Sequence, residues 1–212
     1  TVSACFESYS QAFESNDDNT MYTSTTSGNT CGLIDIPFSG QDKAAWEVEL
    51  MSDTLNDECS LFGCAKKPLT SRCYSSSSDL WMRRAYNGYM YAQGRTASRT
   101  MERIHKGDVV RVEFDAREGT LSYGVNGAEV SVGFTGITDE IYPAIGSYRS
   151  GVVVKLLKVE VFKSHDEKGD VMRSPDKLDW VLPELHANKR EPNILCYPPQ
   201  KSKDTPLSPW IT

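Results

Sequence analysis

Residues that could carry acid–base or metal chemistry are few and widely spaced in this sequence. His105, His165 and His186 fall in polar segments, and no two of them have the spacing of a metal-ligand pair. Asp108 and Asp115 flank one β-prone run, but both stand at turn positions, where an aspartate accepts hydrogen bonds from local backbone amides. No Ser/His/Asp arrangement and no Gly-x-Gly-x-x-Gly phosphate loop occurs. The sequence therefore predicts no catalytic residue, no metal site and no cofactor.

The cysteines also give little support for chemistry. They stand at positions 5, 31, 59, 64, 73 and 196 and include no Cys-x-x-Cys pair. Cys59 and Cys64 flank Leu61 and Phe62, which is typical of buried thiols on a strand. A chain of this length does not need disulfides to fold. We expect free structural cysteines, with metal ligation and disulfides as the alternatives.

Composition narrows the class of partner. The chain has 212 residues, 39% of them hydrophobic, and a net charge of −6, which argues against nucleic acid or an anionic membrane as the partner. It has no apolar run long enough to span a membrane. It shows no signal peptide and no Asn-x-Ser/Thr sequon, so we expect an intracellular, cytoplasmic protein. Because the sequence begins without Met, we expect a fragment of a longer protein.

The clearest structural signal is the segment 107–163, which predicts a three-strand antiparallel meander. Val110, Val112 and Phe114 alternate with charged residues, which is the pattern of a strand with one buried face. A second alternating run ends at Asn126-Gly127, a strong hairpin signal because both residues tolerate the positive φ of a type I′ turn. The buried positions expected on the third strand are Val130, Val132 and Phe134.

Further short strands precede this meander. One is expected over Cys31–Phe38, one around Trp46, and one over the apolar run Cys59–Ala65, which is typical of a central strand covered on both sides. Residues 69–79 form a long flexible loop. Leu80–Ala85 and Tyr89–Tyr91 form a second hairpin, and the polar, basic residues 92–104 carry no strand signal. The expected core aromatics are Trp46, Phe62, Phe114, Tyr123 and Phe134.

The pattern as a whole predicts an all-β sandwich. Many short strands and frequent turns occur with almost no helical period. Residues 164–212 differ, since they contain most of the ten prolines and little periodicity. We expect this segment to be a mostly irregular tail or linker, with wrapping onto the sandwich as one arrangement.

The order of these segments resembles the SPRY domain family over about residues 20–163. The matching pieces are Phe38-Ser39-Gly40, Trp46-Glu47-Val48-Glu49, Leu61-Phe62-Gly63-Cys64-Ala65, Trp81 with Tyr86-Asn87-Gly88, Gly107-Asp108-Val109-Val110, Phe114-Asp115, Gly119-Thr120-Leu121-Ser122-Tyr123, Val125-Asn126-Gly127, Gly133-Phe134 and Tyr142-Pro143-Ala144. The resemblance implies a twisted sandwich of two antiparallel sheets. It would comprise residues 1–163, including an N-terminal extension, with 164–212 outside the motif.

The resemblance also implies a function. SPRY domains generally lack catalytic activity and bind proteins or short peptides through loops at one end of the sandwich, often as recruiting modules of ubiquitin ligases. In the SOCS-box branch, a Tyr after a Pro-Leu start contacts the peptide, and Pro68-Leu69 followed by Tyr74 matches that spacing. The loops after the Tyr-Pro strand and before the Cys31 strand contribute further residues in that branch. The implied partner-binding residues are Arg72, Tyr74, Trp81, Tyr148, Arg149, Thr23 and Thr25.

Other interpretations remain open on the sequence. Tyr74 also fits an ordinary surface residue, and the chain also fits a structural module packed against other domains of its parent. A carbohydrate-binding or hydrolysing sandwich would need paired carboxylates on one sheet face. A local group of arginines is typical either of a solvated face or of a surface for an acidic partner peptide. Its members are Arg83, Arg84, Arg95, Arg99 and Arg103.

Overall fold

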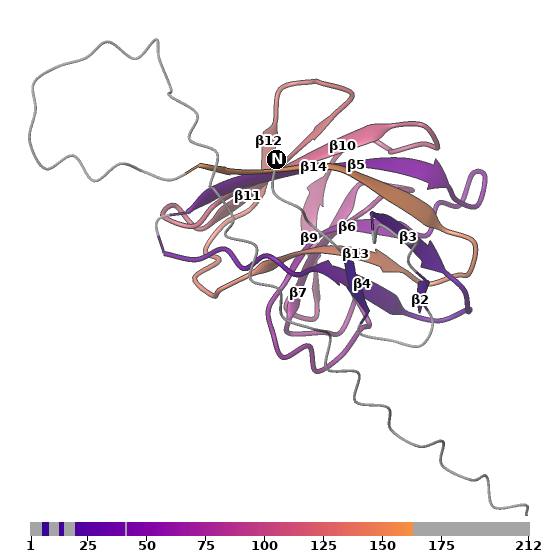
Figure 1. The fold of residues 1–212 in the computed structure, drawn as a ribbon, viewed down its shortest axis with the longest axis horizontal. Coiled ribbons are helices and arrows are strands. Elements are labelled where there is room, and N and C mark those ends of the chain that lie inside the picture. Colours follow the sequence, from indigo (N-terminus) through magenta and orange to yellow (C-terminus); the bar gives the residue numbers. More distant parts are fainter. Residues whose placement is uncertain (1–5, 9–12, 15–19, 41, 163–212) are drawn as a thin grey trace, which may run out of the picture.

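The computed structural model describes residues 6–8, 13–14, 20–40 and 42–162 (Figure 1). Within these ranges the backbone forms two antiparallel sheets of seven strands each and no helix. Accordingly, no described segment is a helix that could cross a membrane. The predicted all-β sandwich of two antiparallel sheets is confirmed. The predicted tail at 164–212 lies outside the described residues.

The strand order of each sheet fixes the architecture. The first sheet runs β1 (Phe6–Ser8), β4 (Thr30–Ile34), β13 (Tyr142–Ser147), β6 (Ser60–Ala65), β7 (Leu80–Arg84), β8 (Tyr89–Ala92) and β9 (Arg95–Thr100). The second runs β12 (Ser131–Phe134), β11 (Thr120–Val125), β10 (Val109–Asp115), β5 (Lys43–Ser52), β14 (Val153–Phe162), β3 (Met21–Ser24) and β2 (Phe13–Glu14). The two layers lie face to face in Figure 1.

The predicted meander is present as β10, β11 and β12. The alternating apolar residues of β10 are buried and its charged residues are half-buried. Asn126 and Gly127 have φ values of 53° and 77°, and Ala128 N donates to Val125 O at 3.0 Å, which together make the expected turn. The third strand departs from prediction at Val132, which is 39% exposed. The pairing of β11 with β12 shifts register between Leu121 and Ser122, which interrupts the alternation.

Two hydrophobic clusters hold the sandwich together. The five predicted core aromatics all lie in the cluster between the sheets. A second cluster covers the opposite face of the first sheet, around Leu61, Leu80 and Met82. Leu69, Tyr74, Tyr142 and Tyr148 pack onto this outer cluster. Because apolar side chains cover both faces of β6, the predicted central strand is confirmed.

Two local predictions need correction. The strand expected over Cys31–Phe38 ends at Ile34, and Phe38 instead forms an isolated bridge with Ile141. The segment 92–104 contains β9, whose polar sequence gave no strand signal. This strand lies at the edge of the first sheet and pairs only with β8, so it needs no alternating apolar face.

The cysteines of the described chain are free thiols. Cys31, Cys59 and Cys64 are buried, as expected for structural cysteines, and Cys73 is half-buried in the 69–79 loop. Burial raises the pKa of the Cys31 thiol to about 12 and that of Cys59 to about 11. These two thiols are therefore uncharged and unreactive at neutral pH.

Candidate functional site

The 69–79 segment is a fixed loop folded over the outer face of the first sheet. Asp79 accepts hydrogen bonds from Thr70 N at 2.7 Å, from the Thr70 hydroxyl and from Ser78 Oγ at 2.9 Å. Burial alone would raise the pKa of Asp79, but these hydrogen bonds outweigh burial and lower it. Ser77 N donates to Cys73 O at 2.8 Å and closes a turn within the loop. The loop predicted over residues 69–79 is present, and its own polar groups link its two ends.

This fold places Tyr74 among aromatic side chains from other elements. Its ring meets Tyr91 of β8 edge-on, with centroids 4.7 Å apart, and lies 5.9 Å from the ring of Tyr148. Tyr148 follows β13, so two loops far apart in sequence meet here. Tyr91 is buried, whereas Tyr74 and Tyr148 are only partly covered. The result is a rigid, partly exposed aromatic group of the kind common at interfaces.

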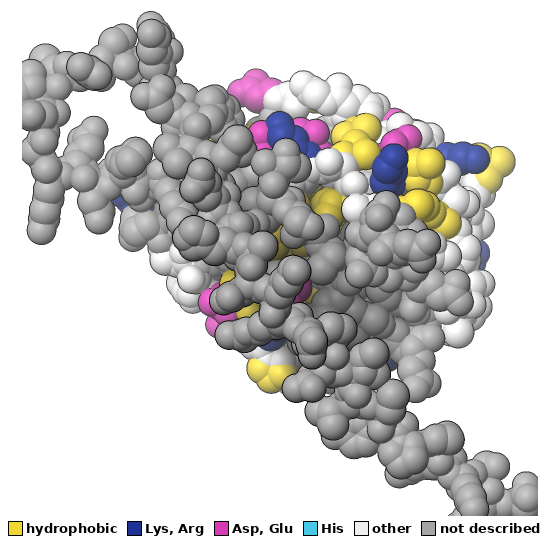
Figure 2. Space-filling model, viewed as in Figure 1, with side chains coloured by type: hydrophobic (Ala, Val, Ile, Leu, Met, Phe, Trp, Pro, Cys, Tyr) yellow, Lys and Arg dark blue, Asp and Glu magenta, His cyan; other side chains and the backbone are white. Residues whose placement is uncertain are grey.

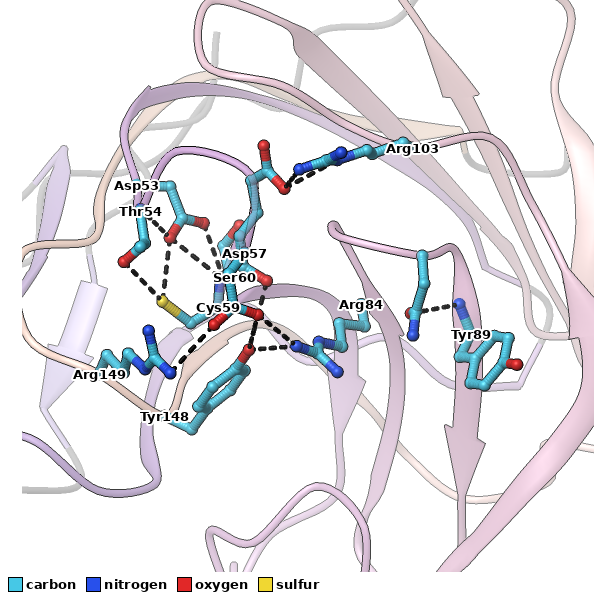
Figure 3. A network of polar contacts seen from close by, with 12 residues as sticks. Asp53, Thr54, Asp57, Cys59, Ser60, Arg84, Tyr89, Arg103, Tyr148 and Arg149 are labelled. Atoms are coloured by element: carbon cyan, nitrogen blue, oxygen red, sulfur yellow. Dashed lines mark hydrogen bonds and ion pairs between the residues drawn. The ribbon is translucent and has the colours of Figure 1, made fainter.

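Two arginines and one aspartate border this aromatic group (Figure 3). Arg84 donates from Nη2 to Tyr148 Oη and pairs with Asp57 Oδ1 at 3.2 Å. Arg149 pairs with the other oxygen, Oδ2, at 3.0 Å. The Arg84 guanidinium also lies over the Tyr148 ring, 5.0 Å from its centroid. We call Tyr74, Tyr148, Arg84, Arg149 and Asp57 the Tyr74–Tyr148 surface.

A second carboxylate, Asp53, fixes the loop that presents Asp57. Asp53 Oδ1 accepts from Thr54 N at 2.7 Å and from Cys59 N at 2.9 Å, and Oδ2 accepts from Ser60 N at 2.9 Å. The Cys59 thiol donates to Asp53 Oδ1 at 3.0 Å (Figure 3). One side chain thus binds both ends of the 53–60 segment. Asp57 is held in place before any partner arrives.

A neighbouring group of charged residues extends the basic border. Arg103 pairs with Glu58 through Nε at 2.9 Å, and His105 Nδ1 lies 3.4 Å from the other Glu58 oxygen. Arg103 and Arg84 both lie over the Tyr86 ring, at 4.6 and 5.2 Å from its centroid. Tyr86 is 36% exposed. The cationic residues here are therefore anchored on rings or carboxylates.

The tyrosines of this surface stay protonated at neutral pH. Burial raises the pKa of Tyr148 to about 12, the Asp57 charge adds to this, and the Arg84 guanidinium opposes it. Burial likewise raises the pKa of Tyr74. Both hydroxyls remain available as neutral donors or acceptors across the physiological range.

The structure unites some of the predicted site residues and separates others. Tyr74, Tyr148 and Arg149 lie together. Arg72 is exposed in the same loop, within electrostatic reach of Cys31 beneath it. Thr25 begins the exposed 25–29 loop, whose Gly28 N donates to Tyr148 O at 3.2 Å.

Trp81 departs from the prediction, and Thr23 lies half-buried in a strand. Thr23 lies inside the second sheet, paired with Val153, and its neighbour Ser24 makes the contact to Arg149 O at 2.7 Å. Trp81 is 3% exposed and belongs to the core between the sheets, so it cannot contact a partner at the surface. The alternation of β7 explains this, since Trp81 and Arg84 point to opposite faces.

The sequence analysis did not identify Asp57 or Tyr91 as site residues. It also did not separate Arg83 from Arg84. Asp57 stands in an acidic loop with no motif around it. Arg83 and Arg84 were grouped together, yet Arg83 is 2% exposed and faces the core. The period of two in β7 was the signal that could have separated these neighbours.

Three glutamates lie side by side on the second sheet, where a carbohydrate site would need carboxylates. Glu47, Glu113 and Glu160 stand on neighbouring strands, and Arg111 binds all three at 2.7, 2.7 and 3.0 Å. Burial opposes ionisation of Glu160, but Lys158 and Arg111 outweigh it and lower its pKa. A general acid needs a raised pKa, so this group does not support glycoside chemistry.

The described residues contain no group of three or more His, Cys, Asp or Glu side chains that could hold a metal ion. On the described part of the face in Figure 2, basic, acidic and hydrophobic side chains are intermixed.

Comparison with known proteins agrees with this architecture. A model of the SPRY domain matches residues 43–158, which is more than half of the chain. The SPRY domain of human HERC1 superposes with a TM-score of 0.66 and 24% identity, over 71% of this chain and 96% of that one. The TRIM65 PSpry domain gives 0.58 and 11%, over 74% and 93%. The neuralized NHR1 domain of Drosophila melanogaster gives 0.51 and 13%, over 74% and 99%.

The structural likenesses, all below 25% identity, support the fold, and the family model supports the assignment. SPRY domains mediate protein–protein interactions and are generally not enzymes, which agrees with a site of rigid aromatics and arginines on a β-sandwich. The chain belongs to the SPRY domain family.

Proposed function

We propose that this SPRY domain binds a short segment of a partner protein at the Tyr74–Tyr148 surface, without catalysing a reaction. The observation that carries the proposal is the contact of the Tyr74 and Tyr148 rings, 5.9 Å apart, which joins two separate loops into one surface. Tyrosine and arginine are the side chains that most often dominate binding energy at interfaces. Because these side chains are already ordered by their neighbours, less conformational entropy is lost on binding.

The charges at this surface favour an acidic segment. The guanidinium groups of Arg84 and Arg149 share one carboxylate, that of Asp57. The side chain of Arg149 is 49% exposed and can donate hydrogen bonds to a second carboxylate without leaving Asp57. An aspartate or glutamate of the partner would bind here, with an apolar or aromatic neighbour against Tyr74.

The proposal includes a cellular setting. Within an intracellular, cytoplasmic parent protein, the domain would bring its partner to the parent's other domains. Recruitment of a substrate to a ubiquitin ligase is the form of this role that the family resemblance suggests. The free thiols of the described chain fit a reducing compartment.

Peptide selection followed by mutagenesis tests the site. A random peptide library is selected on the wild-type domain, and the affinity of the best peptide is measured by calorimetry. Tyr74→Ala and Arg149→Ala should each weaken binding more than tenfold, because each removes an anchor. Arg117→Ala is the matched control, since Arg117 is 70% exposed on the β10–β11 turn and should leave the affinity unchanged.

Two results would contradict this assignment. If Tyr74→Ala and Arg149→Ala both keep wild-type affinity, the peptide binds elsewhere. If selection yields basic peptides without aspartate or glutamate, the charge argument is wrong. Circular dichroism of each variant separates loss of the site from loss of the fold.

A further inference from the structure

Arg83 is a buried cation that the Tyr74–Tyr148 surface does not use. It lies on β7 beside Arg84, but on the face that points between the sheets, and it is 2% exposed. Its guanidinium stands over the ring of Tyr123 in the second sheet, 5.7 Å from the centroid. Among the described residues it makes one hydrogen bond, from Nη2 to the backbone oxygen of Glu102, and no ion pair.

This environment leaves the Arg83 charge poorly compensated. Its Nε is buried and has no hydrogen-bond partner among the described residues. Burial lowers its pKa, although the group stays charged at neutral pH because arginine starts so high. Burying a guanidinium that has no paired carboxylate costs roughly several kcal/mol of desolvation free energy relative to water. The negative charge of Glu102 acts on Arg83 and raises its pKa, but among the described residues the two side chains form no ion pair. Folded proteins usually pair such a buried cation directly with an anion.

A pocket of about 550 Å³ opens directly onto Arg83. Tyr123, Gly124 and Val125 of β11 form one wall, and the chain that follows β9 forms the other. Hydroxyl-bearing residues at the pocket are Thr100 and Ser131, and acidic ones are Glu102 and Glu129. The lining thus combines one buried cation, a mixture of polar and apolar groups, and two exposed carboxylates.

We propose that this pocket is a second binding site, which takes a carboxylate on the guanidinium of Arg83. A planar carboxylate matches the fork of an arginine, and it would satisfy the buried cation. Glu102 and Glu129 add negative charge to the pocket, which disfavours a dianion such as phosphate. The volume exceeds that of the carboxylate alone, so the ligand is either a free small carboxylic acid or an acidic side chain of a bound protein segment.

The two faces of β7 make this site independent of the Tyr74–Tyr148 surface. Arg84 contributes to that surface from the outer face of the sheet, and Arg83 contributes to the pocket from the inner face. A variant at Arg149 should therefore leave the pocket intact. Peptide binding at the Tyr74–Tyr148 surface and carboxylate binding at Arg83 can therefore be tested separately, and one can fail while the other holds.

The Nε–H resonance of Arg83 in a ¹H–¹⁵N spectrum reports directly on this site. The wild-type domain is titrated with sodium acetate and, separately, with a capped Ala-Glu-Ala peptide, at constant ionic strength. We expect a saturable shift of this resonance with at least one of them. If the natural ligand is an acidic side chain of a bound protein, the peptide should have a lower dissociation constant than acetate. Inorganic phosphate at equal ionic strength should give a clearly weaker response.

Two substitutions connect the response to the pocket. Glu129→Gln should strengthen carboxylate binding about threefold, because it removes a negative charge near the anion at an exposed position that the fold does not need. Glu118→Gln is its matched control, since Glu118 is 67% exposed on another turn and should not change the affinity. Arg83→Met should abolish binding, as followed by the amide resonances of Gly124 and Val125.

Several outcomes would overturn the proposal. One is a shift that rises linearly with acetate and with peptide and never saturates. Another is an equal response to phosphate, which would mean general anion screening. A third is an unchanged affinity in Glu129→Gln, which would place the carboxylate away from the pocket.

Discussion

At the scale of single residues, Asp53 shows how one half-buried carboxylate can organise a loop. It accepts three backbone N–H groups, from Thr54, Cys59 and Ser60. Cys59 and Ser60 are fully buried, so their amides have no water to replace this partner. Asp57 and its two arginines depend on the loop that Asp53 closes. Asp53 therefore links the stability of the domain to the proposed partner binding.

The change Asp53→Ala should lower the free energy of unfolding by about 3 kcal/mol, because it leaves buried N–H donors unsatisfied. Urea denaturation followed by tryptophan fluorescence measures the loss. Asp139→Ala serves as the control, since Asp139 is exposed and its ion pair with Lys66 spans 4.0 Å. The control should stay within about 0.5 kcal/mol of wild type. Equal losses in both variants would show that Asp53 does not hold the loop.

The sequence was least informative about which individual residues form the candidate site. Tyr74, Tyr148 and Arg149 came from the family resemblance, and the structure places them together. Trp81 came from the same source but is a core residue. No sequence pattern marks Asp53 or Asp57, since a carboxylate that binds three amides looks like any acidic loop residue until the loop's path is known.

At the scale of elements, β6 is the strand on which the first sheet depends. It lies between β13 and β7, and side chains cover both of its faces. Gly63 lies at its centre, opposite Met82 of β7. A Cβ added at Gly63 would lie 1.9 Å from the backbone oxygen of Trp81, so the two strands could not keep their spacing. Gly146 on β13 offers a contrast, since its added Cβ would meet nothing closer than 3.4 Å.

This contrast predicts very different effects of the same substitution on adjacent strands. Gly63→Ala should destabilise the domain by about 3 kcal/mol or more, because the clash is with backbone and cannot be relieved by a rotamer change. Gly146→Ala should cost at most about 1 kcal/mol, since Leu61 can adjust. Thermal unfolding of both variants measures the difference. Similar melting temperatures for the two would refute the close approach of β6 and β7.

At the scale of the whole molecule, the β-sandwich could be predicted from the sequence. The second hydrophobic cluster, on the outer face of the first sheet, could not. The alternation in β10, with the Asn126-Gly127 turn, indicates which faces meet between the sheets. The loop after β6 folds back and packs Leu69 and Tyr74 against the second cluster. Such a long-range return leaves no periodic trace in the sequence. The candidate site forms where this loop folds back over the sheet. Its residues could therefore be predicted only from the resemblance to a known family.

The two hydrophobic clusters of the sandwich also bury groups that ionise at high pH. Burial raises the pKa of the thiols of Cys31 and Cys64 above the usual 9.0, and that of the phenol of Tyr123 above 10.0. Above pH 9 the unfolded chain loses protons that the folded chain keeps. The free energy of unfolding must then fall as pH rises, because the folded state binds more protons in this range.

Each fully buried group should contribute a slope of about 1.4 kcal/mol per pH unit between its unfolded and folded pKa. Urea denaturation at pH 8, 9, 10 and 11 should therefore show a stability loss that steepens above pH 9. Cys64→Ala should be less stable than wild type at pH 8, because it leaves a cavity, yet its stability should fall less steeply with pH. A pH profile that is flat to pH 11, or a slope unchanged by Cys64→Ala, would mean that these groups are hydrated in the folded state.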